Sequence, residues 1–186
     1  MIRDFGQRYG LTAQILHWIS ALLVGCAWVL GSFGDDLPKG SIRHLGELIH
    51  ISAGQLIVAL LLMRLVWRAI DPPPPMALTS MGLWADRSGR VMHVVLYALL
   101  AAVPIAGVVT LFASGDGLPL FGFGEIPSPW LKDKAFEHNA KEVHETLANA
   151  LIILVLFHAA AAIAHHFYFR DGTLKRMLPL ILDAKE

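Results

Sequence analysis

Two histidines in the last apolar stretch of the chain have a spacing that suits metal binding. His158 follows His144 by fourteen positions. On an α-helix, that separation turns both side chains to within about 40° of each other and places them about 21 Å apart along the axis. One metal ion cannot bind both, which excludes a single zinc site that uses the two. The spacing predicts two separate sites at different depths, each of which needs a second ligand from another helix.

Two further histidines could supply these ligands. His17 lies near the start of the first apolar stretch and His50 near the start of the second. If successive stretches run in opposite directions, His50 reaches the depth of His144, and His17 reaches that of His158. Imidazoles that face each other across a helical bundle can hold haem iron. The sequence therefore predicts two haem sites, an outer tier of His50 with His144 and an inner tier of His17 with His158. Any one of these histidines, taken alone, could instead make an interhelical hydrogen bond.

Other residues are expected near the inner tier. Arg64 follows His50 at the same interval that separates His144 from His158, so its guanidinium could bind a haem propionate or a quinone carbonyl, or it could be an ordinary cytoplasmic anchor. His93 could be an alternative iron ligand, but a hydrogen bond to quinone or propionate, or helix packing, is the favoured interpretation. His165 lies seven positions after His158 and competes with it for the inner tier.

Glycines and two more histidines complete the set. Gly31 follows His17 at this same interval, and the missing side chain could make room for a flat macrocycle at the outer tier. For each glycine alone, close helix contact in a membrane is the simpler explanation. His44 and His138 are predicted to be solvated loop residues, and no internal sequence repeat is evident.

Four long apolar stretches must position these side chains. The chain has 186 residues, of which 55% are hydrophobic and only 16% charged, against about 25% charged in soluble domains. The charges are segregated, which leaves stretches long enough for transmembrane helices of about 20 residues. Four such stretches leave no amphipathic segment to cover them in water. We predict an all-α fold, a four-helix transmembrane bundle in one domain (residues 1–186), with spans at about 11–33, 45–67, 91–113 and 143–169.

The charges also predict orientation and partners. Ten Lys and Arg residues fall on the side of both termini and five on the other. The excess should be cytoplasmic, in a bacterial-type inner (plasma) membrane, with an irregular outer loop over residues 114–140. The zero net charge gives no case for nucleic acid as a partner. The chain has one cysteine, and without a Cys-x-x-Cys-His motif no covalent haem attachment is expected.

These motifs resemble the bacterial cytochrome b561 family over nearly the whole chain. The resemblance implies two b haems with His17, His50, His144 and His158 as axial ligands. The spacing in the last span also resembles the haem subunits of membrane formate dehydrogenases and nickel–iron hydrogenases. The matching stretches are Leu16-His17-Trp18, Ile49-His50-Ile51-Ser52-Ala53-Gly54, His93-Val94-Val95-Leu96-Tyr97, His144-Glu145-Thr146-Leu147-Ala148-Asn149, His158-Ala159-Ala160-Ala161 and His165-His166.

Within this family, the sequence is similar to the superoxide oxidases, which pass an electron from superoxide at the outer face to ubiquinone. That likeness implies ubiquinone as the acceptor, with Arg64, His93 and Trp18 on the quinone side. Basic side chains at the outer face could attract superoxide, although they lie among acidic ones and could simply be solvated. The alternatives are a haem subunit that links a dehydrogenase or hydrogenase partner to the quinone pool, and a scaffold without redox activity. The candidate superoxide-attracting residues are Arg43, Lys132, Lys134 and Lys141.

Overall fold

The computed structural model describes residues 8–72, 74 and 83–178. Each of its four long helices is long and apolar enough to cross a membrane. The predicted all-α fold of four transmembrane helices is therefore confirmed. In chain order the elements are α1 (Leu11–Phe33), the short 3-10 helix η1 (Gly34–Asp36), α2 (Ser41–Ile70), α3 (Leu83–Ala113), strands β1 (Leu118–Pro119) and β2 (Glu125–Ile126), and α4 (Lys134–Phe167).

Local sequence explains where the helices begin and end. Helix α2 ends at Ile70 because Pro72 follows and cannot continue a helix. Helix α4 begins at Lys134, since the Asp133 carboxylate accepts hydrogen bonds from two backbone N–H groups of the first turn, each at 3.0 Å. The predicted outer loop is therefore shorter than expected. His44 and His138 lie in helices α2 and α4, although both are exposed as predicted.

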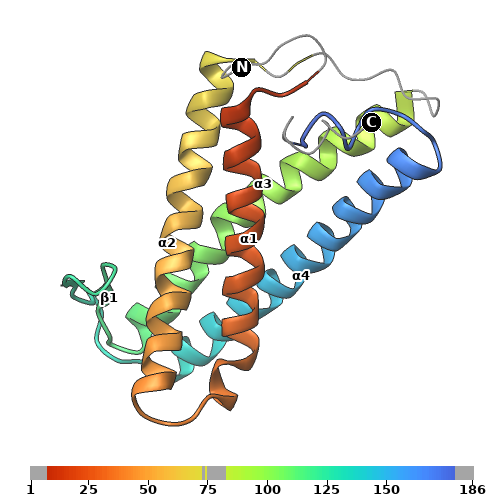
Figure 1. The fold of residues 1–186 in the computed structure, drawn as a ribbon. Coiled ribbons are helices and arrows are strands. Elements are labelled where there is room, and N and C mark those ends of the chain that lie inside the picture. Colours follow the sequence, from red (N-terminus) through yellow and green to blue (C-terminus); the bar gives the residue numbers. More distant parts are fainter. Residues whose placement is uncertain (1–7, 73, 75–82, 179–186) are drawn as a thin grey trace.

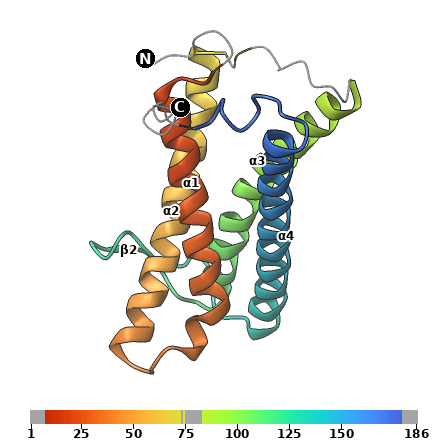
Figure 2. The same ribbon diagram turned by 45° about the vertical axis from the view of Figure 1, so that its right-hand side comes forward.

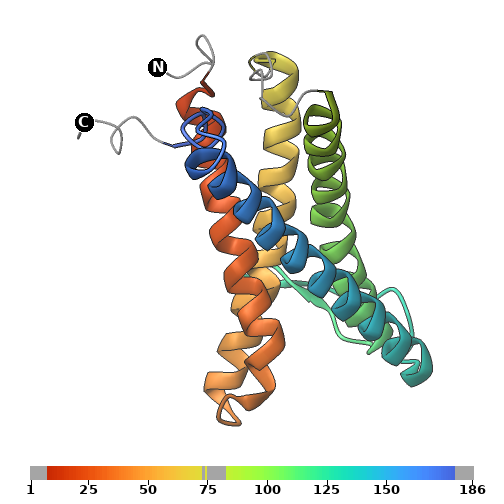
Figure 3. The ribbon, with the colours of Figure 1, turned by 90° about the vertical axis from the view of Figure 1, so that its right-hand side faces the viewer.

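The four helices form two antiparallel hairpins. Helix α1 packs mainly against α2, and α3 packs mainly against α4. The second hairpin is inclined to the first (Figures 1 and 3). Buried aliphatic residues from all four helices meet in one cluster, which holds the two hairpins together. They are Val24, Ile57, Leu61, Leu100 and Leu151.

This apolar cluster lies halfway between the two histidine tiers. Ile57 follows His50 by seven positions, and Leu151 lies seven positions from both His144 and His158. This separation corresponds to about 10 Å of helix. The histidines therefore flank a buried aliphatic layer, one tier on each side.

The loop between α3 and α4 contains a two-stranded antiparallel hairpin that the sequence did not predict. Leu118 pairs with Ile126, and Pro119 pairs with Glu125. The hairpin lies beside α2 (Figures 1 and 2). Gln55 of α2 anchors it there, because its side-chain amide donates a 2.6 Å hydrogen bond to the Pro119 carbonyl.

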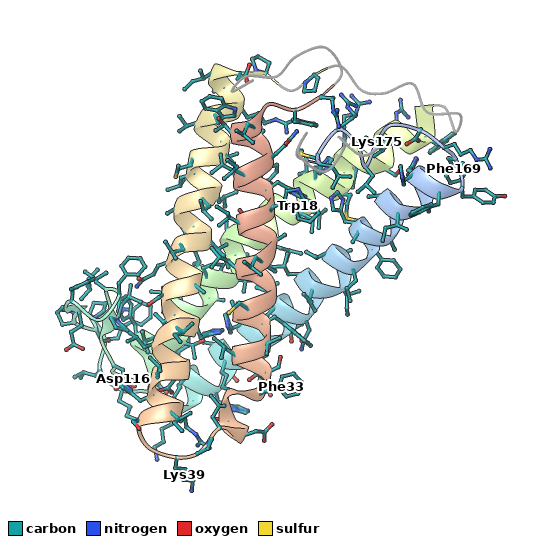
Figure 4. The ribbon with its side chains drawn as sticks, viewed as in Figure 1. Trp18, Phe33, Lys39, Asp116, Phe169 and Lys175 are labelled. Carbon is teal, nitrogen blue, oxygen red and sulfur yellow. The ribbon has the colours of Figure 1, made fainter. Side chains whose placement is uncertain are left out.

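Residues 171–178 return to α1 after the end of α4. The backbone N–H of Tyr9 donates to the Arg176 carbonyl at 3.2 Å, and the Trp18 indole donates to the Met177 carbonyl at 2.8 Å. Figure 4 shows Trp18 on α1 near this returning segment, which carries Lys175. The segment therefore closes the end of the bundle at which α1 begins and α4 ends.

The central layer yields a stability prediction. We expect Leu151→Ala to lower the free energy of unfolding by about 2 kcal/mol or more, because Leu151 is buried among all four helices and its truncation leaves a cavity. Leu156→Ala is the matched control, since Leu156 is 63% exposed on the same helix and should face lipid. Thermal unfolding in detergent measures both. Equal losses for the two variants would contradict the packing described above.

Candidate functional site

The outer tier brings the rings of His50 and His144 together. Their ring centres are 6.1 Å apart and their planes are nearly perpendicular, at 86°. Nδ1 of His50 lies 2.8 Å from the Ala27 carbonyl oxygen, and Nδ1 of His144 lies 2.9 Å from that of Val103. A carbonyl can only accept, so both Nδ1 atoms carry a proton and donate it. Each Nε2 then keeps a free lone pair, which is the tautomer that a metal-binding imidazole needs.

The spacing of this pair suits one haem iron between the rings. A metal–imidazole bond is about 2 Å long and the ligating nitrogen lies about 1 Å from its ring centre, so two rings across one metal ion have centres about 6 Å apart. The observed 6.1 Å agrees with that value. The residues of the outer tier therefore fit an iron porphyrin by distance and by tautomer.

Two glycines make this arrangement possible. A Cβ on Gly31 would lie 2.9 Å from Cε1 of His50, and a Cβ on Gly107 would lie 3.1 Å from Cε1 of His144. Gly31 therefore makes room for the His50 ring. Each glycine lies four positions after the carbonyl that its histidine uses, one helical turn along. Without a Cβ there, a second hydrogen bond can reach that carbonyl.

The role of Gly107 was missed, although a signal was present. Gly107 follows His93 by fourteen positions, just as Gly31 follows His17 by fourteen positions. In the second helix of each hairpin this interval also separates His50 from Arg64 and His144 from His158. The two hairpins thus share a four-position pattern that overall sequence similarity does not reveal. In this pattern His93 corresponds to His17, and Arg64 corresponds to His158.

The inner tier holds three histidines instead of two. The ring centres of His17 and His158 are 6.4 Å apart, which again suits one iron. Those of His93 and His158 are 5.3 Å apart, closer than the spacing of about 6 Å that an iron between two rings requires. By this distance, His17 is the better partner for His158.

Arg64 also lies at the inner tier, as predicted. Its Nη2 is 2.9 Å from Nδ1 of His17. A guanidinium can only donate, so the His17 ring accepts at Nδ1 and, when neutral, carries its proton on Nε2. Iron ligation through Nε2 requires the opposite tautomer. The inner pair therefore fits a haem by distance, and His17 can ligate iron through Nε2 once Arg64 turns away.

Comparison with known proteins gives the family. The model for prokaryotic cytochrome b561 matches residues 8–180. The chain belongs to this family. As a cytochrome b561 it is a membrane protein that binds haem b and transfers electrons, and the four helices make it a multi-pass protein of a bacterial membrane.

Individual relatives agree with this assignment. Cytochrome b561 homolog 2 of Escherichia coli (strain K12) is 34% identical over 173 residues, which are 92% of each chain. Cytochrome b561 homolog 1 of the same strain is 33% identical over 92% of this chain and 97% of its own. A probable superoxide oxidase CybB of Yersinia pestis is 31% identical over 93% of this chain and 97% of its own.

His165 is engaged elsewhere in this cytochrome b561. Its Nδ1 lies 2.6 Å from the carboxylate of Asp171, and both side chains are largely buried. Burial by itself raises the pKa of the Asp171 carboxyl, but hydrogen bonds from Thr173 and His165 outweigh burial and lower that pKa. The contact ties the end of α4 to the returning segment. His165 is therefore not brought to His17, which favours His158 for the inner tier.

The four basic residues considered for superoxide attraction lie on two segments, one around the start of α2 and one around the start of α4. The Arg43 side chain donates to the backbone carbonyls of Asp35 and Leu37. Lys141 pairs with Glu145 at 3.7 Å in an exposed ion pair, and exposed ion pairs hold their partners weakly. The other two, Lys132 and Lys134, are exposed near the start of α4.

The glycine positions give a direct test. We expect Gly31→Ala to displace the His50 ring, because the added Cβ would lie 2.9 Å from Cε1, and so to weaken haem binding at the outer tier. Gly89→Ala is the control, since a Cβ there meets nothing within 4 Å. Haem content and the reduced absorbance spectrum of the purified proteins measure the effect. Full haem content and an unchanged spectrum for Gly31→Ala would contradict the role given to this glycine.

Proposed function

We propose that this cytochrome b561 passes electrons from superoxide at its outer face to ubiquinone, through two b haems. His50 with His144 hold one haem, and His17 with His158 hold the other. The observation that supports the proposal most strongly is the pair of ring-centre distances, 6.1 Å and 6.4 Å, on opposite sides of one buried apolar layer. Both termini are then cytoplasmic, as the distribution of Lys and Arg favours.

The reaction balances with electrons and protons alone. Two superoxide ions each lose one electron and become O₂, and ubiquinone takes up both electrons and two protons to become ubiquinol. A haem held by two imidazoles would supply electron transfer without an open site for oxygen. The protein must then orient the four imidazoles, keep the central layer dry and admit the quinone near the inner tier.

The hydrogen bonds of the outer tier support the assignment of His50 and His144 as haem ligands. Both Nδ1–H groups are held by backbone carbonyls, so both Nε2 atoms carry a free lone pair without a change of tautomer. At the inner tier, ligation by His17 frees the Arg64 guanidinium. That group can then bind a propionate or a quinone carbonyl, with His93 as a second hydrogen-bonding group beside it.

Two observations support superoxide as the electron donor: the name of one relative and the positive side chains near the outer tier. The relative named as a probable superoxide oxidase matches nearly the whole chain. Lys132, Lys134 and Lys141 lie near the start of α4, within a few turns of His144. Positive charge near a site raises the local concentration of a small anion.

One observation favours the alternative, a haem subunit that serves a dehydrogenase or hydrogenase partner. Phe123 and Leu131 of the α3–α4 loop are 96% and 94% exposed. Large apolar side chains exposed at one end of a molecule are typical of contact surfaces. Co-purification with an iron–sulfur protein would support this alternative over the proposed function.

The ligand assignment is tested by removing one histidine from each tier. We expect His144→Ala to lose the outer haem and keep the inner one, and His158→Ala to do the reverse, because each tier then lacks one iron ligand. His138→Ala is the control, since His138 is exposed on the same helix. Haem per chain and a redox titration measure the outcome. Two haems per chain in either tier variant would show that the assignment is wrong.

The role of the outer charges is tested by charge reversal. We expect Lys132→Glu combined with Lys134→Glu to slow superoxide-driven quinone reduction several-fold at low ionic strength, because the approaching anion is repelled. The difference from wild type should shrink at high salt. Arg87→Glu, at the opposite end of the bundle on α3, is the control. Equal rates for the double variant and wild type at low salt would remove these lysines from the proposal.

A further inference from the structure

Two cavities lie on either side of a shared wall near the inner tier. The first is a cleft of about 70 Å³ between α1, α2 and α3, whose lining includes the polar side chains of Arg64, Arg68, His93 and Tyr97. The second is an apolar groove of about 350 Å³ on the α1–α2 seam, formed largely by Leu62, Met63 and Val66. Leu16 and Trp67 line both.

The groove faces the surroundings of the helices rather than the core of the bundle. Leu62, Met63 and Val66 are each more than half exposed, at 57%, 56% and 60%. In a membrane-spanning helix such side chains contact lipid tails. The groove therefore suits a flexible hydrocarbon chain that arrives from the bilayer.

The cleft, unlike the groove, has charged and polar side chains in its wall, and it adjoins the candidate redox centre. Its wall residue Arg64 lies 2.9 Å from Nδ1 of His17, and His93 lies beside His158. A carbonyl group that reaches the cleft would thus be next to the inner imidazole pair. Arginine, histidine and tyrosine side chains can all donate hydrogen bonds to it.

The wall between the two cavities contains an unsatisfied donor. The indole Nε1 of Trp67 is buried and has no hydrogen-bond partner in the described part of the chain. A buried N–H without an acceptor is costly, and it gains one if a carbonyl group comes to the wall. The indole is uncharged, so it suits a neutral carbonyl better than a phosphate.

We propose that the seam between α1 and α2 at Trp67 is the quinone site, with the isoprenoid tail in the groove and the ring at the wall residue Trp67, where one carbonyl reaches the cleft. The Trp67 N–H donates to one quinone carbonyl. This inference rests on the proposed function for the identity of the ligand. It adds the route of access, the helices that form the site and a positioning residue that the sequence did not indicate.

Two variants separate the head from the tail. Trp67→Phe keeps an aromatic ring but removes the donor, so the dissociation constant should rise about tenfold for short-chain and long-chain ubiquinone alike. Val66→Trp fills the groove, so it should weaken long-chain ubiquinone and leave a ubiquinone with one isoprene unit unchanged. Val94→Trp is the matched control, because Val94 is 67% exposed on α3 and lines neither cavity.

The measurement is calorimetric titration of each quinone into the haem-loaded protein in nanodiscs, with the reduced absorbance spectrum recorded for every variant. Unchanged binding of both quinones by Trp67→Phe would overturn the inference. So would equal effects of Val66→Trp and Val94→Trp on the long-chain quinone. If Trp67→Phe altered only the haem spectrum, Trp67 would contact the haem and the inference would likewise fail.

Two further outcomes distinguish this inference from the proposed function. If phosphatidylglycerol in the nanodisc displaced the long-chain quinone and Trp67→Phe weakened only the lipid, the seam would be a phospholipid site and the inference would be overturned. If wild-type protein bound quinone at this seam as expected but took no electrons from superoxide, the assignment of the seam as the quinone site would remain valid. The donor in the proposed function would then be wrong.

Discussion

An imidazole at membrane depth needs an acceptor for its N–H, and this requirement shapes the outer end of the bundle. Water is absent there, so the acceptor must come from the protein. His50 and His144 each use the carbonyl of a neighbouring helix, at Ala27 and Val103. Those carbonyls are already within helical ladders, and a second donor can reach them only where the residue one turn later has no side chain. The hydrogen bond, the glycine and the free Nε2 are therefore one structural unit, which occurs once in each hairpin.

The apolar layer separates the outer tier from the inner tier. Val24, Ile57, Leu100 and Leu151 each lie seven positions from a tier histidine on their own helix. The layer keeps the tiers about 20 Å apart along the helices and contributes no charged or polar side chain between them. It therefore excludes water from the middle of the bundle while leaving each end open to different chemistry.

Long apolar stretches predicted the four helices, and residue spacing predicted the pairing of the histidines by depth and the place of Arg64 and His93 beside the inner pair. These features follow from helix geometry and from the direction of successive spans. The role of Gly107 followed from the interval that also relates His144 to His158, but it was missed because no aligned repeat drew attention to it. The hairpin of β1 and β2, the contact of Arg64 with His17 and the wall at Trp67 depend on how the two hairpins incline to each other. No local pattern encodes that angle.

The pattern shared by the two hairpins explains why the two ends differ. At the outer tier the equivalent positions hold the same residues, so His50 and His144 are alike in partner and tautomer. At the inner tier the equivalent positions hold different residues. Arg64 occupies the position in the first hairpin that His158 occupies in the second. This single difference leaves His17 with a donor where a carbonyl would be expected. It also places a cation in a cleft that shares a wall with the lipid-facing groove. The outer tier is thus fixed by backbone, whereas the inner tier must rearrange its side chains to bind iron. An end of the bundle that can exchange hydrogen bonds in this way is the end suited to receive a second, diffusible ligand.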